Sequence, residues 1–175
     1  DSNALIKDVS ASGAISVKTT YEKTQADDHE GYADLSDIGG LFGSIDSSYI
    51  KNGSATNTIA VETNGEMYSI GGISGSFYSS LYDTGTTSGN LTVTLTNEAT
   101  WLSQIGGAFG YVSESTLKDV TSTRNITTVG TTSEGAESIG GLVGEAETVN
   151  ITHSSYTGTI DFDSLKYAQN VGGLV

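Results

Sequence analysis

The sequence contains no cysteine and no proline. The absence of cysteine excludes a disulfide framework and any metal site that is built on thiolates. The absence of proline excludes proline-rich linkers and leaves every backbone amide able to donate, which suits continuous β-ladders. The chain also lacks a signal peptide and any apolar run long enough to span a bilayer. We therefore expect no membrane insertion of this segment.

Basic residues are scarce: 7 Lys and Arg residues stand against 21 Asp and Glu residues, giving a formal net charge of −14. No basic stripe is present to release counterions, which disfavours nucleic acid and anionic membranes as partners. An acidic composition rich in Thr, Ser and Gly is typical of a protein outside a bacterial cell, on its surface or secreted. We expect the partner to be a glycan or protein on a host or neighbouring cell. The sequence leaves the oligomeric state open.

Hydrophobic residues make up only 35% of the 175 residues. The core must therefore be thin and linear, as in a solenoid. What the chain does contain is an Ile-Gly-Gly-Leu motif that returns in altered forms at steps of 32, 35, 34 and 32 residues. The five copies begin at Ile38, Ile70, Ile105, Ile139 and Val171. A fixed period of this length indicates stacked copies of one supersecondary unit.

A second block starts 12 residues after the leading Ile in four copies, and a fifth copy that begins at Ile6 without a leading motif aligns with them without a gap. The tenth position of this block is always Ile or Leu: Ile15, Ile59, Leu91, Ile126, Ile160. The third position, which we expect to form a bend, holds Asp8, Asn52, Thr84, Asp119, His153. The eighth position, where we expect a left-handed turn, holds Gly13, Asn57, Gly89, Arg124, Gly158. Arg124 fits that turn poorly.

The segments favour strands over helices because they are crowded with Gly, Ser, Thr, Asn and β-branched residues. Alternate residues are apolar in stretches such as 91–95. These patterns predict an all-β fold, a right-handed parallel β-helix of about five coils with three short strands per coil. The leading Ile residues and the tenth-position residues should point inward and stack as ladders along the axis.

The whole chain, 1–175, is then one β-solenoid segment, which we expect to be an excerpt of a longer array. Residues 1–37 form a partial coil with a long loop, and 171–175 begin another repeat. The full repeats are 38–69, 70–104, 105–138 and 139–170.

The motif Ile139-Gly140-Gly141-Leu142-Val143-Gly144, followed by Ile/Leu-x-Asx and a small-residue run into Gly-x-Ile, resembles the GLUG repeat of bacterial surface proteins. The resemblance covers the chain from about Ile6 to its end. It implies a non-catalytic region of an adhesin, a stalk or ligand-presenting scaffold. The alternative is a spacer in a large secreted peptidase, since the repeat also occurs in non-catalytic parts of immunoglobulin-A-cleaving peptidases.

We do not expect this segment to be an enzyme. The peptidase motif His-Glu-x-x-His is absent, because His29-Glu30 is followed by Ala33 where the second His must be. No partnered pair of carboxylates is evident for acid/base chemistry. We expect no cofactor. Calcium at Asp27-Asp28-His29-Glu30 with Asp34 and Asp37 is a weaker alternative to a solvated acidic loop, because the ligand spacing of a known calcium loop is missing.

Two columns of hydroxyl side chains should run along the rod at the fifth and seventh block positions. They are Ser10/Ser12, Ser54/Thr56, Thr86/Ser88, Thr121/Thr123 and Ser155/Thr157. A regular Thr array is what an ice-binding solenoid requires, so ice binding is a minor alternative. The simpler interpretation is an ordinary exposed strand, because half of these residues are Ser and lack the methyl group.

Every change in repeat length falls between the tenth block position and the next Gly-Gly motif. These loops should leave the same corner of successive coils and form one continuous strip, and binding surfaces are commonly placed on such loops. The aromatic residues of the strip are our candidate ligand contacts: Tyr21, Tyr32, Tyr68, Trp101, Tyr167. The other interpretation is that each ring covers the edge of its own coil.

Overall fold

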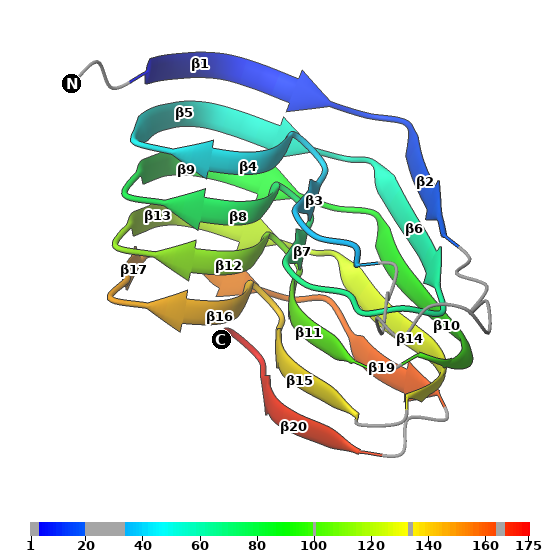
Figure 1. The fold of residues 1–175 in the computed structure, drawn as a ribbon. Helices are drawn as coiled ribbons and strands as arrows, with labels where there is room; N and C mark the ends of the chain where they lie inside the picture. Colours follow the sequence, from blue (N-terminus) through cyan, green and yellow to red (C-terminus); the bar gives the residue numbers. More distant parts are fainter. Residues whose placement is uncertain (1–3, 20–33, 100, 133–134, 164–166) are drawn as a thin grey trace.

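The computed structural model describes residues 4–19, 34–99, 101–132, 135–163 and 167–175, and all regular structure within them is β-strand. The strands stack on one another in register, with every pairing parallel, and build a β-solenoid (Figure 1). This architecture is consistent with the right-handed parallel β-helix that the sequence predicts. In the described part of the chain no helix is long and apolar enough to cross a membrane.

The strands form four sheets, one on each wall of the solenoid. Sheet A consists of β1 (Ala4–Ala11), β5 (Ser48–Ala55), β9 (Leu81–Thr87), β13 (Thr116–Ser122), β17 (Asn150–Thr152) and β18 (Ser155–Tyr156). Sheet B consists of β2 (Ala14–Lys18), β6 (Thr58–Thr63), β10 (Asn90–Ala99), β14 (Asn125–Thr132) and β19 (Ile160–Asp163). Sheet C consists of β3 (Ile38–Gly39), β7 (Ile70–Gly71), β11 (Leu102–Gly106), β15 (Ala136–Gly140) and β20 (Ala168–Gly172). Sheet D consists of β4 (Phe42–Asp46), β8 (Ser74–Tyr78), β12 (Phe109–Ser113) and β16 (Val143–Glu147).

Each coil runs through sheets A, B, C and D in that order, so the chain makes four full circuits and a partial fifth. A full coil therefore has four strands, one more than the sequence analysis assigned. The difference arises at the Gly-Gly motif, which we had assigned to a single strand. The chain bends at the glycine pair and places the preceding Ile in sheet C and the following segment in sheet D.

The two predicted apolar ladders are confirmed. Ile59, Leu91 and Ile126 are direct partners in adjacent strands of sheet B, and all three are buried. In sheet C, Ile70 and Ile105 pair directly and are fully buried. The leading residues of the remaining three copies, Ile38, Ile139 and Val171, continue the same column. Identical apolar side chains on successive coils thus remove one another from water.

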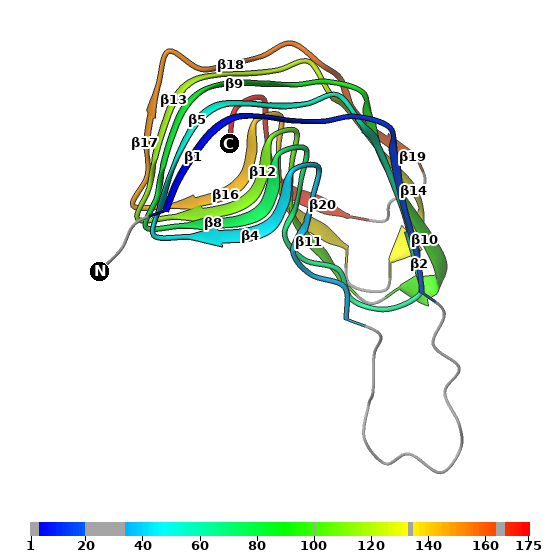
Figure 2. The same ribbon diagram turned by 90° about the horizontal axis from the view of Figure 1, so that it is seen from above.

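The core has two lobes rather than one. One lobe lies between sheets A and D and includes Phe77, Tyr82 and Phe109, whose rings contact one another at centroid distances from 5.3 to 6.2 Å. The other lobe lies between sheets B and C and contains both Ile/Leu ladders together with Met67. Viewed down the axis, the chain encloses these two lobes and turns inward between them at the junction of sheets C and D (Figure 2).

At this junction the second glycine of each of the first four Gly-Gly pairs faces the corner between sheets A and B. A Cβ atom on Gly107 would lie 2.5 Å from Ser122 Oγ, and one on Gly40 would lie 2.6 Å from Asn57 Oδ1. Cβ atoms do not come so close to other heavy atoms, so only glycine fits here without movement. The glycine pairs are therefore needed because two walls of the solenoid approach closely.

Arg124 lies inside this junction, with 0% of its surface exposed. Its Nη1 donates to Asn57 O at 2.7 Å and its Nη2 to Asn57 Oδ1 at 3.1 Å. Nε and Nη2 both donate to Thr87 Oγ1, at 3.1 and 3.0 Å. No ion pair among the described residues includes Arg124, and burial lowers its pKa to about 10. The guanidinium thus joins the second, third and fourth coils through neutral acceptors.

Left-handed backbone marks three corners of every coil, and only one of them is the bend that the sequence predicts. That bend, at the third block position, has φ between 49° and 66° in all five coils. The second corner is the residue before each leading Ile, and the third is the junction between sheets D and A. The predicted left-handed turn at the eighth block position occurs at Gly13 and Gly89 but is wrong for Asn57, Arg124 and Gly158, which are not among the positive-φ residues. The side chains of Asn57 and Arg124 are used inside the solenoid instead.

Candidate functional site

Sheets C and D meet at an angle that opens to the outside of the solenoid (Figure 2). Side-chain hydrogen bonds cross this angle and a cleft lies within it, and we call its surface the C/D groove. Hydrogen bonds cross it: Gln104 Nε2 at the end of sheet C donates to Glu145 Oε2 of sheet D at 3.1 Å, and Ser76 Oγ of sheet D donates to Asp37 Oδ1. The sheets come close because sheet D has glycine at the contact. A Cβ atom on Gly43 would lie 2.8 Å from Asp37 O. The sequence therefore builds the groove from the Gly-Gly bend and from the glycine that follows it three residues later.

Within the groove lies a cleft of about 650 Å³ between β15, β16 and β20. Its polar lining comes from two carboxylates, one amide and two hydroxyls: Glu137, Glu145, Asn170, Ser103, Ser138. Asn170 Nδ2 donates a hydrogen bond to Glu137 Oε1 at 3.2 Å. Glu145 likewise accepts a hydrogen bond from a side-chain amide, that of Gln104. The sequence analysis did not pair Glu137 with Glu145, because they lie on different strands and come together only through the bend between sheets C and D.

Three predicted ligand contacts lie on the sheet C side of the groove. Tyr68 and Trp101 are half-buried, and Tyr167 is 58% exposed. Met67, Leu102 and Ala136 are partners in one column of sheet C and point inward, and Ala168 continues this column. Tyr68, Trp101 and Tyr167 are each next to a member of the column along the chain, so their side chains point to the outer face. Tyr68 donates its hydroxyl to Glu66 Oε2 on the same surface. Tyr21 and Tyr32 lie outside the described residues.

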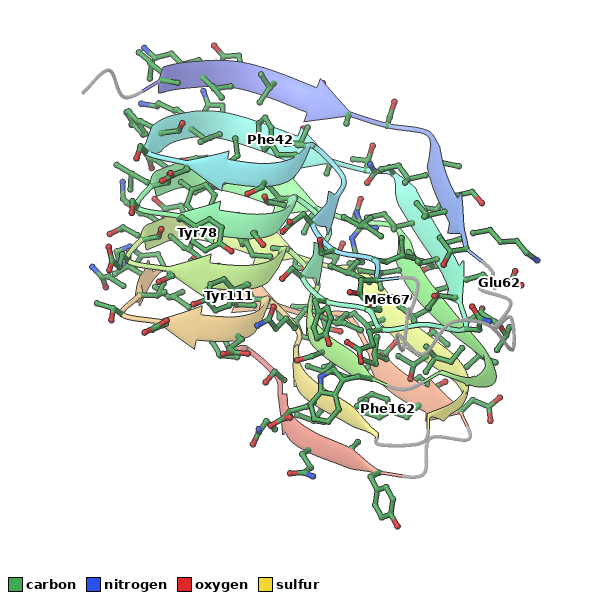
Figure 3. The ribbon with its side chains drawn as sticks, viewed as in Figure 1. Phe42, Glu62, Met67, Tyr78, Tyr111 and Phe162 are labelled. Atoms are coloured by element: carbon green, nitrogen blue, oxygen red, sulfur yellow. The ribbon has the colours of Figure 1, made fainter. Side chains whose placement is uncertain are left out.

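Two further aromatic residues, which the sequence analysis missed, lie on sheet D. Tyr78 of β8 and Tyr111 of β12 are neighbours on the outer face of this sheet, with ring centroids 5.6 Å apart (Figure 3). Tyr111 donates its hydroxyl to Glu147 Oε2 at 2.8 Å, and this hydrogen bond, with partial burial, raises the pKa of Tyr111. The length variation that directed attention to the loops has no counterpart in sheet D, so no sequence signal marked these rings.

The loops of variable length do leave the solenoid at one corner, between sheets B and C. Of the proposed calcium cluster, Asp27, Asp28, His29 and Glu30 lie outside the described residues, whereas Asp34 and Asp37 are exposed. Among the residues that the structure describes, no group of three or more His, Cys, Asp or Glu side chains is placed to hold a metal ion.

Of the two predicted hydroxyl columns, the one at the fifth block position lies on sheet A, whereas the residues of the seventh position follow the ends of the sheet A strands. Ser54, Thr86 and Thr121 are register partners in successive strands, and Ser10 and Ser155 extend the column to both ends. The same sheet carries a column of charged side chains: Lys7, Lys51, Asp83, Lys118. These charges interrupt the flat hydroxyl surface that binding to ice would require.

We compared the chain with protein-family models, with curated proteins and with solved structures, and none of the three comparisons found a significant match. The resemblance to the GLUG repeat therefore stays a prediction from the motif residues.

Proposed function

We propose that this chain is a non-catalytic repeat region of a bacterial cell-surface or secreted adhesin, and that its C/D groove presents the ligand-binding surface. The observation that supports this most directly is the grouping of aromatic side chains on the two walls of the groove. Tyr68 and Trp101 lie just before the sheet C strands β7 and β11, and Tyr78 and Tyr111 lie on sheet D.

A glycan is the ligand that this surface suits best. Flat aromatic rings bind the apolar faces of sugars, and hydroxyl, amide and carboxylate groups beside them accept and donate hydrogen bonds to sugar hydroxyls. Tyr78 and Tyr111 are held on paired parallel strands, so little conformational entropy is lost when a ligand binds to them. The alternative, a structural spacer in a large secreted peptidase, needs no such surface.

The test compares aromatic variants on opposite sides of the solenoid. Trp101→Ala and Tyr68→Ala should weaken binding to a panel of immobilised glycans or to cells about tenfold or more, as for central contacts in other interfaces. Tyr49→Ala is the matched control, because Tyr49 is also half-buried but lies on sheet A. It should bind like the parent, and all three variants should keep a melting temperature near that of the parent.

Two results would contradict the proposal. If Trp101→Ala and Tyr68→Ala melt well below the parent and lose binding only in proportion to lost folded protein, these rings are packing groups. If the parent protein binds no glycan and no cell surface, the spacer is the better account.

A further inference from the structure

Positive charge is segregated away from the C/D groove. Within the described residues, the lysines are Lys7, Lys51 and Lys118 on sheet A and Lys18 on sheet B, and all but the half-buried Lys51 are exposed. The only other described Lys or Arg is Arg124, which is fully buried. The strands of sheets C and D contain neither Lys nor Arg. Two walls of the solenoid thus carry all the described surface cations, and the two walls of the groove carry none.

The acidic side chains of the groove are held in place without being neutralised. Neutral donors bond to Glu137, Glu145 and Glu147: the Asn170 amide, the Gln104 amide and the Tyr111 hydroxyl. In contrast, the ion pairs among the described residues all lie on sheets A and B, where Glu62 pairs with Lys18 and both Asp83 and Asp119 pair with Lys118. His153, the remaining cationic partner, also lies on the sheet A side.

A ligand for this face must therefore supply positive charge. Like charges repel an anionic polymer such as a uronic acid polysaccharide or a nucleic acid. A cation in the cleft gains from two fixed carboxylates, Glu137 and Glu145. Further cations of the same polymer can gain from aromatic faces elsewhere on the two walls. The neutral amides and hydroxyls already hold the carboxylates in position, so a bound cation need not order them.

Amino sugars meet these conditions better than a basic peptide does. The amino group of glucosamine is attached directly to a rigid ring, and the ring itself can stack on an aromatic side chain. A Lys or Arg side chain must instead lose the freedom of several rotatable bonds for each contact. Resting on the proposed glycan-binding function, we infer that the C/D groove selects a cationic glycan, a polymer of sugars that carry free amino groups.

The experiment uses two sugars with the same backbone, one with a protonated amine on each ring and the other with a neutral acetamide. Binding of the chain to a glucosamine hexamer and to an N-acetylglucosamine hexamer is measured by calorimetry at about pH 6, where amino sugars are protonated, with hexalysine as a third probe. The glucosamine hexamer should bind at least about tenfold more tightly than the acetylated one, and its affinity should fall as the salt concentration rises from about 50 to about 300 mM.

Isosteric variants test whether the preference for the glucosamine hexamer arises from the carboxylates of the groove. Glu137→Gln and Glu145→Gln keep an acceptor oxygen and remove the charge, and each should weaken binding of the glucosamine hexamer about fivefold or more, a larger loss than for the acetylated hexamer. Asp161→Asn is the matched control, because Asp161 is exposed on sheet B. It should leave both affinities unchanged.

The possible failures are distinct. Equal affinity for the two hexamers would overturn the charge selection and leave the glycan-binding function standing. Tighter binding of hexalysine than of the glucosamine hexamer would overturn the amino-sugar assignment in favour of a basic polypeptide. If none of the three probes binds but the parent binds another glycan of the panel, the inference again fails alone. If the parent binds no probe, no panel glycan and no cell surface, the proposed function fails with it.

Discussion

Leu91→Asp is expected to destabilise the protein by about 4 kcal/mol or more, a large part of the stability of an ordinary domain. Leu91 has 0% of its surface exposed and lies between Ile59 and Ile126 in the ladder of sheet B. A carboxylate there has apolar neighbours on the coils before and after it, within the apolar lobe that sheet B shares with sheet C. Thermal and denaturant unfolding followed by circular dichroism measure the loss.

Thr92→Asp is the control for this variant. Thr92 is the next residue on the same strand, points to the outer face and pairs with Ala60 and Thr127. The same new charge is solvated there, so stability should change by less than about 0.5 kcal/mol. Equal stability of the Leu91 variant and the parent would mean that Leu91 does not face the interior, and the register of the coils would then be wrong.

The second large effect is expected at Arg124. Arg124→Ala should cost about 3 kcal/mol, because it leaves Asn57 O, Asn57 Oδ1 and Thr87 Oγ1 without these donors and opens a cavity at the junction of the two lobes. Arg124→Lys should not restore stability, because one ammonium cannot replace the planar guanidinium that reaches acceptors on two other coils. Denaturant midpoints of the two variants give the measurement.

Thr123→Ala is the matched control for the Arg124 variants, since Thr123 is exposed and adjacent in sequence. It should unfold like the parent. If Arg124→Ala is instead as stable as the parent, the cost of burying the guanidinium cancels all of its hydrogen bonds, and Arg124 contributes to specifying the fold without adding to its stability.

The ladders could be predicted from the sequence because the spacing from leading Ile to tenth-position residue is always 21 residues. Constant spacing leaves only one register in which Ile stacks on Ile at both positions, and the structure has that register. The bend at the third block position was predicted on similar grounds. Asp8 and Asn52 both favour left-handed backbone, and Asn52 Nδ2 also donates to Asp8 Oδ1 along the column at 2.8 Å.

The bend between sheets C and D could not be predicted, and the groove depends on it. A Gly-Gly pair permits a strand, a bulge or a sharp turn equally well, because glycine restricts the backbone so little. The role of Arg124 was hidden for a related reason. Aligned columns imply equivalent roles, yet Arg124 occupies a column otherwise held by Gly or Asn and extends past Gly72 into the interior.

The candidate site was therefore predicted only in part. Tyr68 and Trp101 were found because loops of variable length drew attention to the corner between sheets B and C. Tyr111, Glu137 and Glu145 lie on strands of regular length. The alternation of inward and outward side chains along a strand predicts only that they face outward, as many other strand residues do. Their proximity depends on the angle between two sheets, which no pattern within one repeat encodes.

The most direct test of the C/D groove as the binding surface is an NMR titration of the isotope-labelled protein with the tightest glycan from the binding experiments. The chain contains one Trp, so its indole N–H gives a single resonance from Trp101 on the wall of the groove. We expect this resonance and the backbone signals of β11, β12, β15 and β16 to shift together with one dissociation constant, while the signals of sheet A stay in place. Shifts confined to sheet A, with an unchanged Trp101 resonance, would contradict the account.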